Sequence, residues 1–396
     1  MPGTWLLGQR TGSDGGEAGE IRTEPPRAVL LALRPAGPRP GTDGDDDGDP
    51  SLAELARLAE TDGLAVVGEL TQNRRSPDPA TYLGSGKVEE LARLVEQEAA
   101  DLVIVDGEPT PAQVRGLEDR TGVRVADRTA LILDIFAEHA HSREGKAQVE
   151  LAQLAYQLPR LRGSGQGLSR VGGGRVAGGA GIGVRGPGEQ RLETQRRRLR
   201  QRMSVLRDQI GRLARRRETT RARRSRNRVP SVAISGYTNA GKSSLLNRLA
   251  TADALVEDAL FATLDPLVRR TRLPDGTTAT LIDTVGFVRH LPHQLIDAFR
   301  STLDEIAAAD LVLHVVDASA PDAIDQITTV RGVLHDIEAA HRPELLALNK
   351  IDVAEPDRVA ALEHAYPGSV PVSAATGEGL DRLREEIEKR LRDLQG

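Results

Sequence analysis

Eight residues in the second half of the chain, Gly236 to Ser243, follow the spacing G-x-x-x-x-G-K-[ST]. This spacing is typical of a loop that binds nucleotide phosphates, because its glycines let successive backbone N–H groups point at one anion. A helix that begins at the loop adds the positive end of its dipole. Lys242 would then reach the outer phosphates, and the Ser243 hydroxyl would bind Mg²⁺. The residues expected at the phosphates are Gly236, Tyr237, Thr238, Asn239, Ala240, Gly241, Lys242, Ser243 and Ser244.

A second group of residues could act at the outermost phosphate. Asp283 follows a predicted strand over residues 277–282 and begins the sequence Asp-Thr-Val-Gly. A carboxylate at this position can hold the water shell of Mg²⁺. Gly286 lacks a Cβ, so its N–H can come close to a γ-phosphate. We therefore expect Asp283, Thr284, Val285 and Gly286 to contact the nucleotide.

A threonine between these two motifs is a candidate for a ligand that joins Mg²⁺ only when a triphosphate is bound. Thr263 lies in such a segment, which would order around the γ-phosphate and be released after hydrolysis. Threonine is common in loops, so the spacing alone leaves this assignment open. Its neighbours Phe261, Ala262, Leu264 and Asp265 would line the nucleotide. The predicted catalytic residues are thus Lys242, Thr263 and Gly286, and the predicted metal ligands are Ser243 and Thr263.

A third group predicts which base is bound. Asn349, Lys350, Ile351 and Asp352 form the sequence N-K-x-D after a predicted strand over residues 345–348. The Asp352 carboxylate can accept hydrogen bonds from a ring N–H and an exocyclic amine, which guanine presents and adenine does not. Asn349 can address the exocyclic oxygen, and the stem of Lys350 can pack over the base. The residues whose backbone would close the pocket are Ser373, Ala374 and Ala375. GTP is therefore the predicted substrate.

The residue after Gly286 gives an expectation about rate. Many GTPases place a water-orienting glutamine there, whereas this chain has Phe287. Phenylalanine cannot orient water by hydrogen bonding, so we expect slow intrinsic hydrolysis and help from a partner, a potassium ion or another side chain. Asn239 could ligate a monovalent cation beside the phosphates, or it could only stabilise the loop.

The elements that must position these residues form a predicted C-terminal P-loop GTPase domain over residues 229–396. Before it, strands alternate with helices, which favours a small parallel α/β domain over residues 27–127. Within that domain, Ser51 and Glu54 predict a capping box, and Pro111 suits the first turn of a helix. Residues 1–26 lack periodicity and are expected to be a disordered tail.

Residues 128–228 follow a different pattern. Leu151, Leu154, Leu158 and Leu161, and then Leu192, Leu199, Met203, Leu206, Ile210 and Leu213, keep the spacing of a heptad seam. Two such helices predict an antiparallel hairpin, joined by the glycine-rich loop 163–190. The arginines of the second helix lie mostly off the seam. A solvated charged face is the usual interpretation, but acids are few here, so a surface that faces RNA is favoured. The glycine-rich loop would be a mobile tip whose conformation adapts to the surface of the RNA.

Composition restricts the class of protein. The 396 residues suffice for two or three domains, and 28% are charged, as in ordinary globular proteins. The absence of cysteine excludes disulfides and thiolate metal sites, and it fits a reducing, cytoplasmic location. No run of about 18 apolar residues is present, so we expect no membrane span. We expect a monomer.

The sequence resembles the HflX family of ribosome-associated GTPases. The segments that carry this resemblance include GAGIGVRGPGEQRLETQRR, LGSGKVEEL, the stretch from Asp127 to Gly163, and GYTNAGKSSLLN with DTVGF. It covers roughly residues 60–390. The sequence GEQRLETQ departs from the commoner GET-(K/Q)-(L/I)-ETD of the family. The chain also ends soon after a predicted helix over residues 380–394, so we expect it to lack the extra C-terminal domain of longer members.

The resemblance implies binding to the large ribosomal subunit and its RNA, and separation of stalled or idle ribosomes under stress. It further implies that the ribosome stimulates hydrolysis of GTP, and some members are reported to use ATP through the N-terminal region. Two other hypotheses remain open at this point. One is an RNA-binding module for which nucleotide is only a structural ligand, and the other is a GTP-dependent switch that acts on a protein partner.

Overall fold

The structure is a computed structural model that describes residues 24–34, 50–161, 187–226, 229–250, 267–289 and 293–394. It divides into two compact units, one of residues 1–138 with 150–207 and one of residues 139–149 with 208–396. The tail before residue 24, most of the glycine-rich loop and the segment with Thr263 lie outside the described residues. The predictions made for them, including those for Phe261, Ala262, Leu264 and Asp265, stay predictions.

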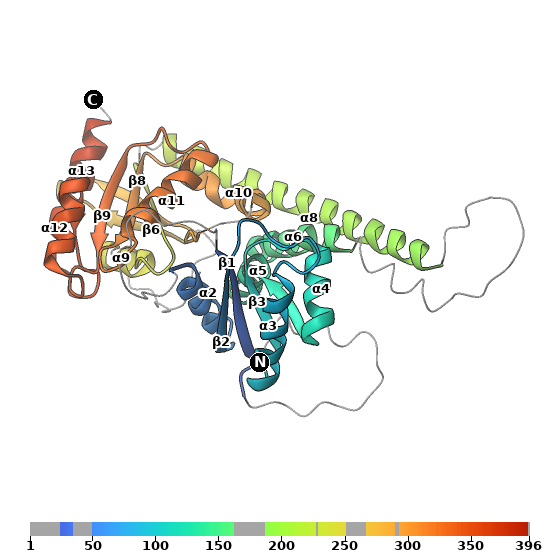
Figure 1. Cartoon of the computed structure of the whole chain (residues 1–396). Helices are drawn as coiled ribbons and strands as arrows, with labels where there is room; N and C mark the ends of the chain where they lie inside the picture. Colours follow the sequence, from blue (N-terminus) through green and yellow to red (C-terminus); the bar gives the residue numbers. More distant parts are fainter. Residues whose placement is uncertain are drawn as a thin grey trace, which may run out of the picture. The chain divides into compact units, whose positions relative to one another are not determined.

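The first unit contains a parallel sheet of four strands with the order β2-β1-β3-β4 (Figure 1). Its strands are β1 (Arg27–Arg34), β2 (Ala65–Asn73), β3 (Leu102–Asp106) and β4 (Arg124–Asp127). The helices that connect and follow them are α2 (Pro50–Thr61), α3 (Ser85–Gln97), α4 (Pro111–Thr121) and α5 (Arg128–His139). This arrangement confirms the predicted parallel α/β fold. β2 extends beyond the predicted residues 64–67. The prediction stopped there because β2 is an edge strand, largely half-exposed, and its second half is too polar to show an apolar pattern.

Local sequence explains where α4 begins and ends. The Thr110 hydroxyl accepts from the Gln113 N–H, and the Gln113 side chain accepts from the Thr110 N–H, so the two residues form a capping box. Pro111 occupies the first turn, as predicted. Gly122 ends the helix at φ 71°, a conformation that glycine adopts without strain.

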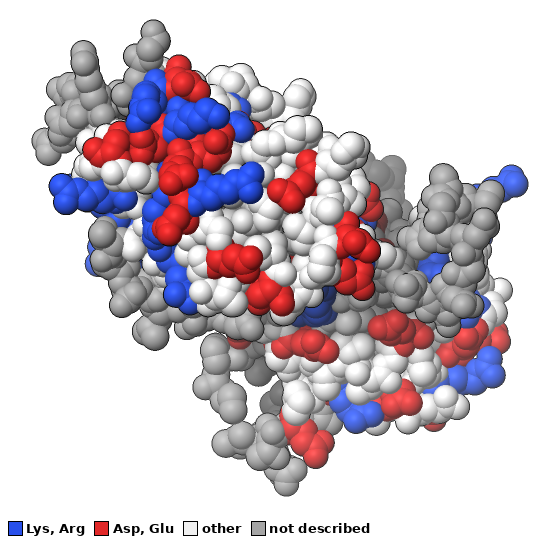
Figure 2. All heavy atoms as spheres, turned by 90° about the vertical axis from the view of Figure 1, so that its left-hand side faces the viewer, with Lys and Arg blue, Asp and Glu red and all other residues white. Residues whose placement is uncertain are grey.

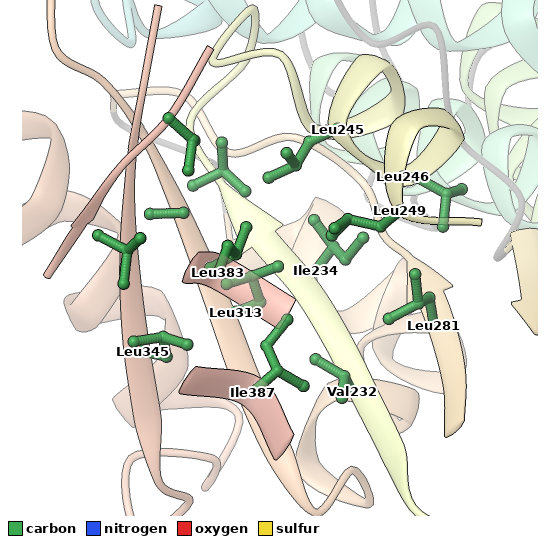
Figure 3. Packing of buried hydrophobic residues seen from close by; sticks show 14 of the residues in the cluster. Val232, Ile234, Leu245, Leu246, Leu249, Leu281, Leu313, Leu345, Leu383 and Ile387 are labelled. Atoms are coloured by element: carbon green, nitrogen blue, oxygen red, sulfur yellow. The ribbon is translucent and has the colours of Figure 1, made fainter. Parts of the chain in front are cut away.

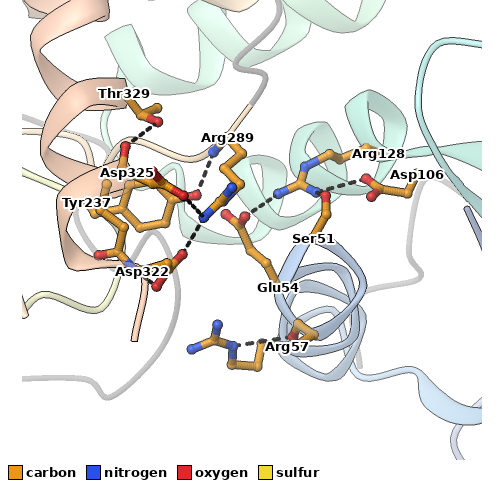
Figure 4. A network of polar contacts seen from close by, with 12 residues as sticks. Ser51, Glu54, Arg57, Asp106, Arg128, Tyr237, Arg289, Asp322, Asp325 and Thr329 are labelled. Atoms are coloured by element: carbon orange, nitrogen blue, oxygen red, sulfur yellow. Dashed lines mark hydrogen bonds and ion pairs between the residues drawn. The ribbon is translucent and has the colours of Figure 1, made fainter. Parts of the chain in front are cut away.

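A buried network of charges joins α2, β3 and α5 (Figure 4). The Arg128 guanidinium lies 2.7 Å from Glu54 Oε2 and 2.9 Å from Asp106 Oδ1. Breaking such a pair by removing one partner typically costs about 3–5 kcal/mol. The predicted capping box of α2 is wrong: the helix starts at Pro50, so Ser51 lies within its first turn and Glu54 faces Arg128.

The two long helices α6 (Arg143–Arg160) and α8 (Pro187–Arg226) correspond to the predicted arms. In α8, Met203 and Leu206 are buried, and the seam residues Leu192, Leu199, Ile210 and Leu213 are half-buried. In the part of α6 that belongs to the first unit, Ala152 and Tyr156 are buried while the predicted leucines are only half-buried. The Arg202 guanidinium of α8 binds the Glu150 carboxylate of α6 through two hydrogen bonds of 2.6 and 2.7 Å.

The tyrosine of α6 is buried because the end of that helix is tied to the sheet. The Arg160 guanidinium stacks on the Tyr156 ring, 3.5 Å from its centroid, and binds Asp127 Oδ2 at 2.6 Å. Asp127 ends β4, and its other carboxylate oxygen accepts from the Ala130 N–H of α5. These contacts hold the last turn of α6 against the end of β4.

The second unit contains a sheet of six strands with the order β10-β9-β8-β5-β7-β6, in which only β6 is antiparallel to its neighbour (Figure 1). Its strands are β5 (Ser231–Gly236), β6 (Leu267–Arg272), β7 (Thr278–Asp283), β8 (Leu311–Asp317), β9 (Glu344–Asn349) and β10 (Val370–Pro371). Its helices are α9 (Lys242–Leu249), α10 (His293–Ala307), α11 (Ala323–Asp336), α12 (Pro356–Ala365) and α13 (Leu380–Asp393).

Two strands of this sheet were not predicted, β6 and the two-residue β10. β6 reads LVRRTR and exposes Val268, Arg270 and Arg272, so it lacks the apolar signal of its neighbours. Its buried Thr271 donates a hydrogen bond to the carbonyl of Leu249. The strand forms because the adjacent β7 supplies a partner along its whole length.

The main core of the second unit lies between the sheet and helices α9 and α13 (Figure 3). Val232 and Ile234 of β5 pack with Leu245 and Leu249 of α9. On α13 the buried residues are Leu380, Leu383, Ile387 and Leu391, one face of an amphipathic helix. This packing holds α9 directly behind the end of β5. Within the described part of the chain, no helix is long and apolar enough to cross a membrane.

Candidate nucleotide-binding site

The loop between β5 and α9 has the backbone of a phosphate loop. Gly236 has φ 152°, and a Cβ there would lie 2.2 Å from the carbonyl oxygen of Val315. Gly241 precedes α9 at φ 86°, and a Cβ there would lie 2.3 Å from Asn349 Nδ2. Asn239 adopts the left-handed conformation at φ 61°, which asparagine tolerates better than most residues. Glycine is therefore required at both positions, because neighbouring atoms of the protein occupy the space that a Cβ would take.

Lys242 lies at the centre of this loop. Its Nζ donates to the carbonyl of Tyr237 at 2.7 Å, and the side chain is buried. Burial lowers the pKa of the Lys242 ammonium to about 8, although the nearby Asp283 carboxylate acts in the opposite direction. A Cβ on Gly286 would lie 2.8 Å from Lys242 Nζ, so the predicted γ-phosphate contact and the predicted catalytic lysine are neighbours.

Two residues predicted to act at Mg²⁺ also meet: Ser243, a predicted ligand, and Asp283, predicted to hold the water shell of the ion. Ser243 Oγ donates to Asp283 Oδ2 at 2.7 Å, and Asp283 is fully buried. The Thr284 hydroxyl donates to the carbonyl of Ile234 at 2.7 Å, which ties the end of β7 to β5. A hydroxyl and a carboxylate side by side are the oxygen donors that Mg²⁺ prefers, and Mg²⁺ usually binds through few protein groups together with substrate phosphates. Thr263 lies outside the described residues, so its predicted role remains a prediction.

The N-K-x-D residues join the phosphate loop to the loop 373–375. Asn349 donates through Nδ2 to the carbonyl of Ala240 at 2.8 Å and accepts at Oδ1 from the Ala374 N–H at 2.9 Å. The Ser373 hydroxyl donates to Asp352 Oδ1 at 2.6 Å. Lys350 has φ 65° and pairs with Asp317 at 2.7 Å. The sequence did not predict that the Asn349 amide bridges the two loops; its contact with a base oxygen stays a prediction.

A cavity of about 660 Å³ lies beside these residues. Its lining residues are Gly241, Ser244, Asn247, Arg248, Asn349, Lys350, Asp352, Val353, Ala374 and Ala375. Most of them were predicted as nucleotide contacts, whereas Asn247, Arg248 and Val353 were not. Asn247 and Arg248 face the cavity because α9 continues past the motif, and helical spacing from Ser244 could have indicated this. Residues predicted to contact the phosphates and residues predicted to contact the base therefore line the same cavity.

Phe287 is buried, and its backbone is joined to the phosphate loop. Its N–H donates to the carbonyl of Gly236 at 3.1 Å, and its carbonyl accepts from the Thr238 N–H at 2.7 Å. Two residues later, the Arg289 N–H donates to the Tyr237 hydroxyl at 2.7 Å (Figure 4). The Arg289 guanidinium binds Asp322 at 2.5 Å and lies 3.7 Å from Asp325 (Figure 4). Neither the Tyr237 hydroxyl nor Arg289 was singled out from the sequence.

Comparisons with known proteins agree with this geometry. Family models match residues 49–137 as a GTP-binding GTPase N-terminal region, 139–224 as a GTP-binding GTPase middle region and 231–350 as a 50S ribosome-binding GTPase. The chain is 47% identical to the GTPase HflX of Caldanaerobacter subterraneus subsp. tengcongensis, with 94% of this chain and 82% of that protein covered. It is 48% identical to the GTPase HflX of Alkalihalophilus pseudofirmus, over 88% of this chain and 80% of that protein.

A third relative extends the comparison to a more distant bacterium. The chain is 43% identical to the GTPase HflX of Escherichia coli K12, over 86% of this chain and 79% of that protein. These identities span both compact units as well as the nucleotide motifs. The chain therefore belongs to the HflX family of GTPases, and it is a GTP-binding enzyme of this family.

Proposed function

We propose that this GTPase binds the large ribosomal subunit in the cytoplasm and separates the subunits of stalled or idle ribosomes under stress. The observation that carries the proposal is that one chain combines the nucleotide site with a long helix whose exposed positions are rich in arginine. Among the residues of α8 whose side chains the structure describes, the exposed arginines are Arg197, Arg198, Arg200, Arg202, Arg207, Arg212 and Arg215. Of these, Arg202 forms a close ion pair with Glu150, and the guanidinium of Arg200 forms a longer one with Glu193, at 4.0 Å.

The charged surface around α12 and α13 shows the contrast. On the face drawn in Figure 2, which carries α12 and α13 in Figure 1, basic and acidic side chains are mixed. Along α13 they pair, as in Arg384 with Asp381 at 3.0 Å and Arg390 with Glu386 at 3.1 Å. Such pairs along one helix neutralise each other. The arginines of α8 instead present a positive surface of the kind that binds a polyanion such as RNA.

The proposed chemistry uses few protein groups. Lys242 would hold the outer phosphates, Ser243 would bind Mg²⁺ directly, and Asp283 would hold its water shell. Mg²⁺ would neutralise the charge that develops on the transferred phosphoryl group. The Phe287 side chain is buried and has no hydrogen-bonding group that could orient water. This supports slow intrinsic hydrolysis that the ribosome accelerates. Potassium near Asn239 is a further candidate activator, and turnover in sodium and in potassium buffer tests it.

The ribosome assignment is tested with purified 70S particles in sucrose gradients. With non-hydrolysable GTP, we expect the wild-type protein to convert 70S particles into subunits, and large subunits to raise its GTP turnover. Replacing Arg197 and Arg198 by Glu should lower both effects about tenfold or more and leave intrinsic turnover unchanged, because many phosphate contacts add up and weaken with salt. Arg382→Glu reverses the charge of an exposed arginine on α13 and serves as the control, which should leave both effects unchanged.

Two results would contradict this assignment. If the 70S fraction does not fall at any concentration of wild-type protein, the splitting role is wrong. If binding to large subunits is insensitive to salt and to the charge reversal on α8, recognition does not run through these arginines. A salt-insensitive protein partner would then favour a signalling switch.

The guanine assignment has its own test at Asp352. We expect Asp352→Asn to lower the preference for GDP over xanthosine diphosphate on the order of 100-fold. The physical reason is that an amide can donate to the C2 oxygen of xanthine, whereas it cannot accept both hydrogens of guanine. Equilibrium binding of fluorescent GDP and xanthosine diphosphate measures the ratio. Asp357→Asn, an exposed acid on α12, should leave it unchanged. An unaltered ratio in the Asp352 variant would refute the role of that carboxylate.

A further inference from the structure

Arg248 makes the contacts that connect α9 to the loop 373–375. Its Nε donates to the carbonyl of Ala374 at 2.9 Å, and its Nη2 donates to the carbonyl of Ala375 at 2.5 Å. The two carbonyls belong to adjacent residues, so the planar guanidinium holds a short piece of backbone in a fixed orientation. Arg248 also lines the cavity, together with Asp352 and both alanines.

The same loop is held from its other side by the N-K-x-D residues. The Ala374 N–H donates to Asn349, and the Ser373 hydroxyl donates to Asp352. Inside the loop, the Thr376 N–H donates to the Ser373 hydroxyl at 3.0 Å. N–H groups and a hydroxyl therefore face the base-recognition residues, while the carbonyls of Ala374 and Ala375 face Arg248. Removing Arg248 would leave the loop attached on one side only.

Arg248 is itself held in place at the end of α9. Its carbonyl accepts a hydrogen bond from Arg384 Nη2 at 2.7 Å, and Arg384 Nη1 pairs with Asp381 at 3.0 Å on α13. The helix that begins with Lys242 at the phosphate loop thus places Arg248, in its last turn, at the loop 373–375, about 9 Å further along its axis. One rigid element contacts both ends of the nucleotide site.

We propose that Arg248 is a positioning residue that keeps the base loop closed and thereby sets how long guanine nucleotides stay bound. The proposal rests on the assignment of the cavity to the guanine base. Because the loop would contact the base and not the γ-phosphate, its loosening affects GDP and GTP alike. It acts on dissociation more than on association, since most changes within one binding site appear in the dissociation rate.

The test is stopped-flow release of fluorescent GDP and fluorescent non-hydrolysable GTP from the full-length protein. We expect Arg248→Ala to raise both dissociation rates by about the same factor, roughly tenfold, because two hydrogen bonds from a charged donor are lost. Association rates should stay within about twofold of wild type. Arg248→Lys should recover only part of the loss, because a single ammonium cannot hold both carbonyls in one plane.

The control and the contrary outcomes separate this inference from the proposal on which it rests. Arg382→Ala removes an exposed arginine from neighbouring α13 and should release nucleotide at the wild-type rate. Dissociation rates within twofold of wild type in Arg248→Ala would overturn the inference, as would a change confined to GTP or an equal change in the control. If Asp352→Asn alters base preference while Arg248→Ala has no effect, only the inference fails. If Asp352→Asn keeps its preference for guanine, the assignment of the cavity to the guanine base is wrong, and the proposal that rests on it falls as well.

Discussion

Replacing Lys242 by Ala is expected to lower kcat/KM for GTP by about 1000-fold, or roughly 4 kcal/mol of transition-state stabilisation. Lys242 is a buried cation beside Gly286, and its Nζ is 2.7 Å from the Tyr237 carbonyl. A charge-assisted contact with phosphate in so buried a position is strong, and no other lysine is placed to replace it in the described part of the loop. GTP turnover and binding of fluorescent GDP measure the loss.

The pH dependence of GDP binding distinguishes loss of a contact between Lys242 and phosphate from a general loss of protein structure. Burial lowers the pKa of free Lys242 to about 8, and contact with phosphate raises it again. Affinity for GDP in the wild type should therefore fall progressively as the pH rises through about 8, because binding must then take up a proton. Lys242→Ala should lack this fall. Lys389→Ala, which removes an exposed lysine of α13, should keep both the affinity and its pH dependence. A Lys242 variant that binds GDP normally would contradict the assignment.

Replacing Asp62 by Asn is expected to stabilise the first unit at neutral pH. Asp62 follows α2, its side chain is buried, and neither carboxylate oxygen has a hydrogen-bond partner among the described residues. Burial raises the pKa of this carboxyl from 3.8 to about 9, and the charges of Asp134 and Glu138 act in the same direction. The folded protein then keeps a proton that the unfolded chain releases above pH 4.

The sign of the effect follows from this difference in bound protons. The raised pKa leaves stability unaffected below pH 4, lowers it progressively between pH 4 and pH 9, and has a constant cost above pH 9. At pH 7.5 the cost has an upper bound of roughly 5 kcal/mol, from 1.36 kcal/mol for each pH unit. Relaxation around the group reduces it, so we expect a gain on the order of 2 kcal/mol from Asp62→Asn at this pH, and nearly none at pH 4.

Hydrogen exchange of the α2 and α5 amides in the full-length protein measures this gain without requiring that both units unfold together. Protection in the variant should exceed that in the wild type at pH 7.5 and match it near pH 4, after correction for the intrinsic exchange rate. Asp119→Asn, an exposed acid on α4, should show no difference at either pH. Equal protection of wild type and Asp62→Asn at pH 7.5 would show that the buried carboxyl imposes no cost.

The features of this protein that depend on local chemistry can be predicted from its amino-acid sequence. Glycines at fixed spacing before Lys242, a carboxylate at a strand end and the N-K-x-D pattern identify a nucleotide site because phosphate, Mg²⁺ and guanine each require particular groups. Alternation of strands and helices predicted the parallel sheet of the first unit, and the predicted seam of α8 contains its buried residues Met203 and Leu206. β6 escaped prediction because its sequence is half arginine, and pairing with β7 forms it.

The side chains that hold the loops of the nucleotide site together can be identified only in the folded protein. Asn349 bridges two loops 109 residues and 25 residues away in sequence, and Arg248 reaches the carbonyls of residues 126 and 127 positions later. No spacing rule predicts such contacts, because they depend on how α9 and β9 pack against the same core. The same reason applies to Asp62: its sequence neighbours are those of an ordinary helix end, and its raised pKa arises from burial beside residues of α5.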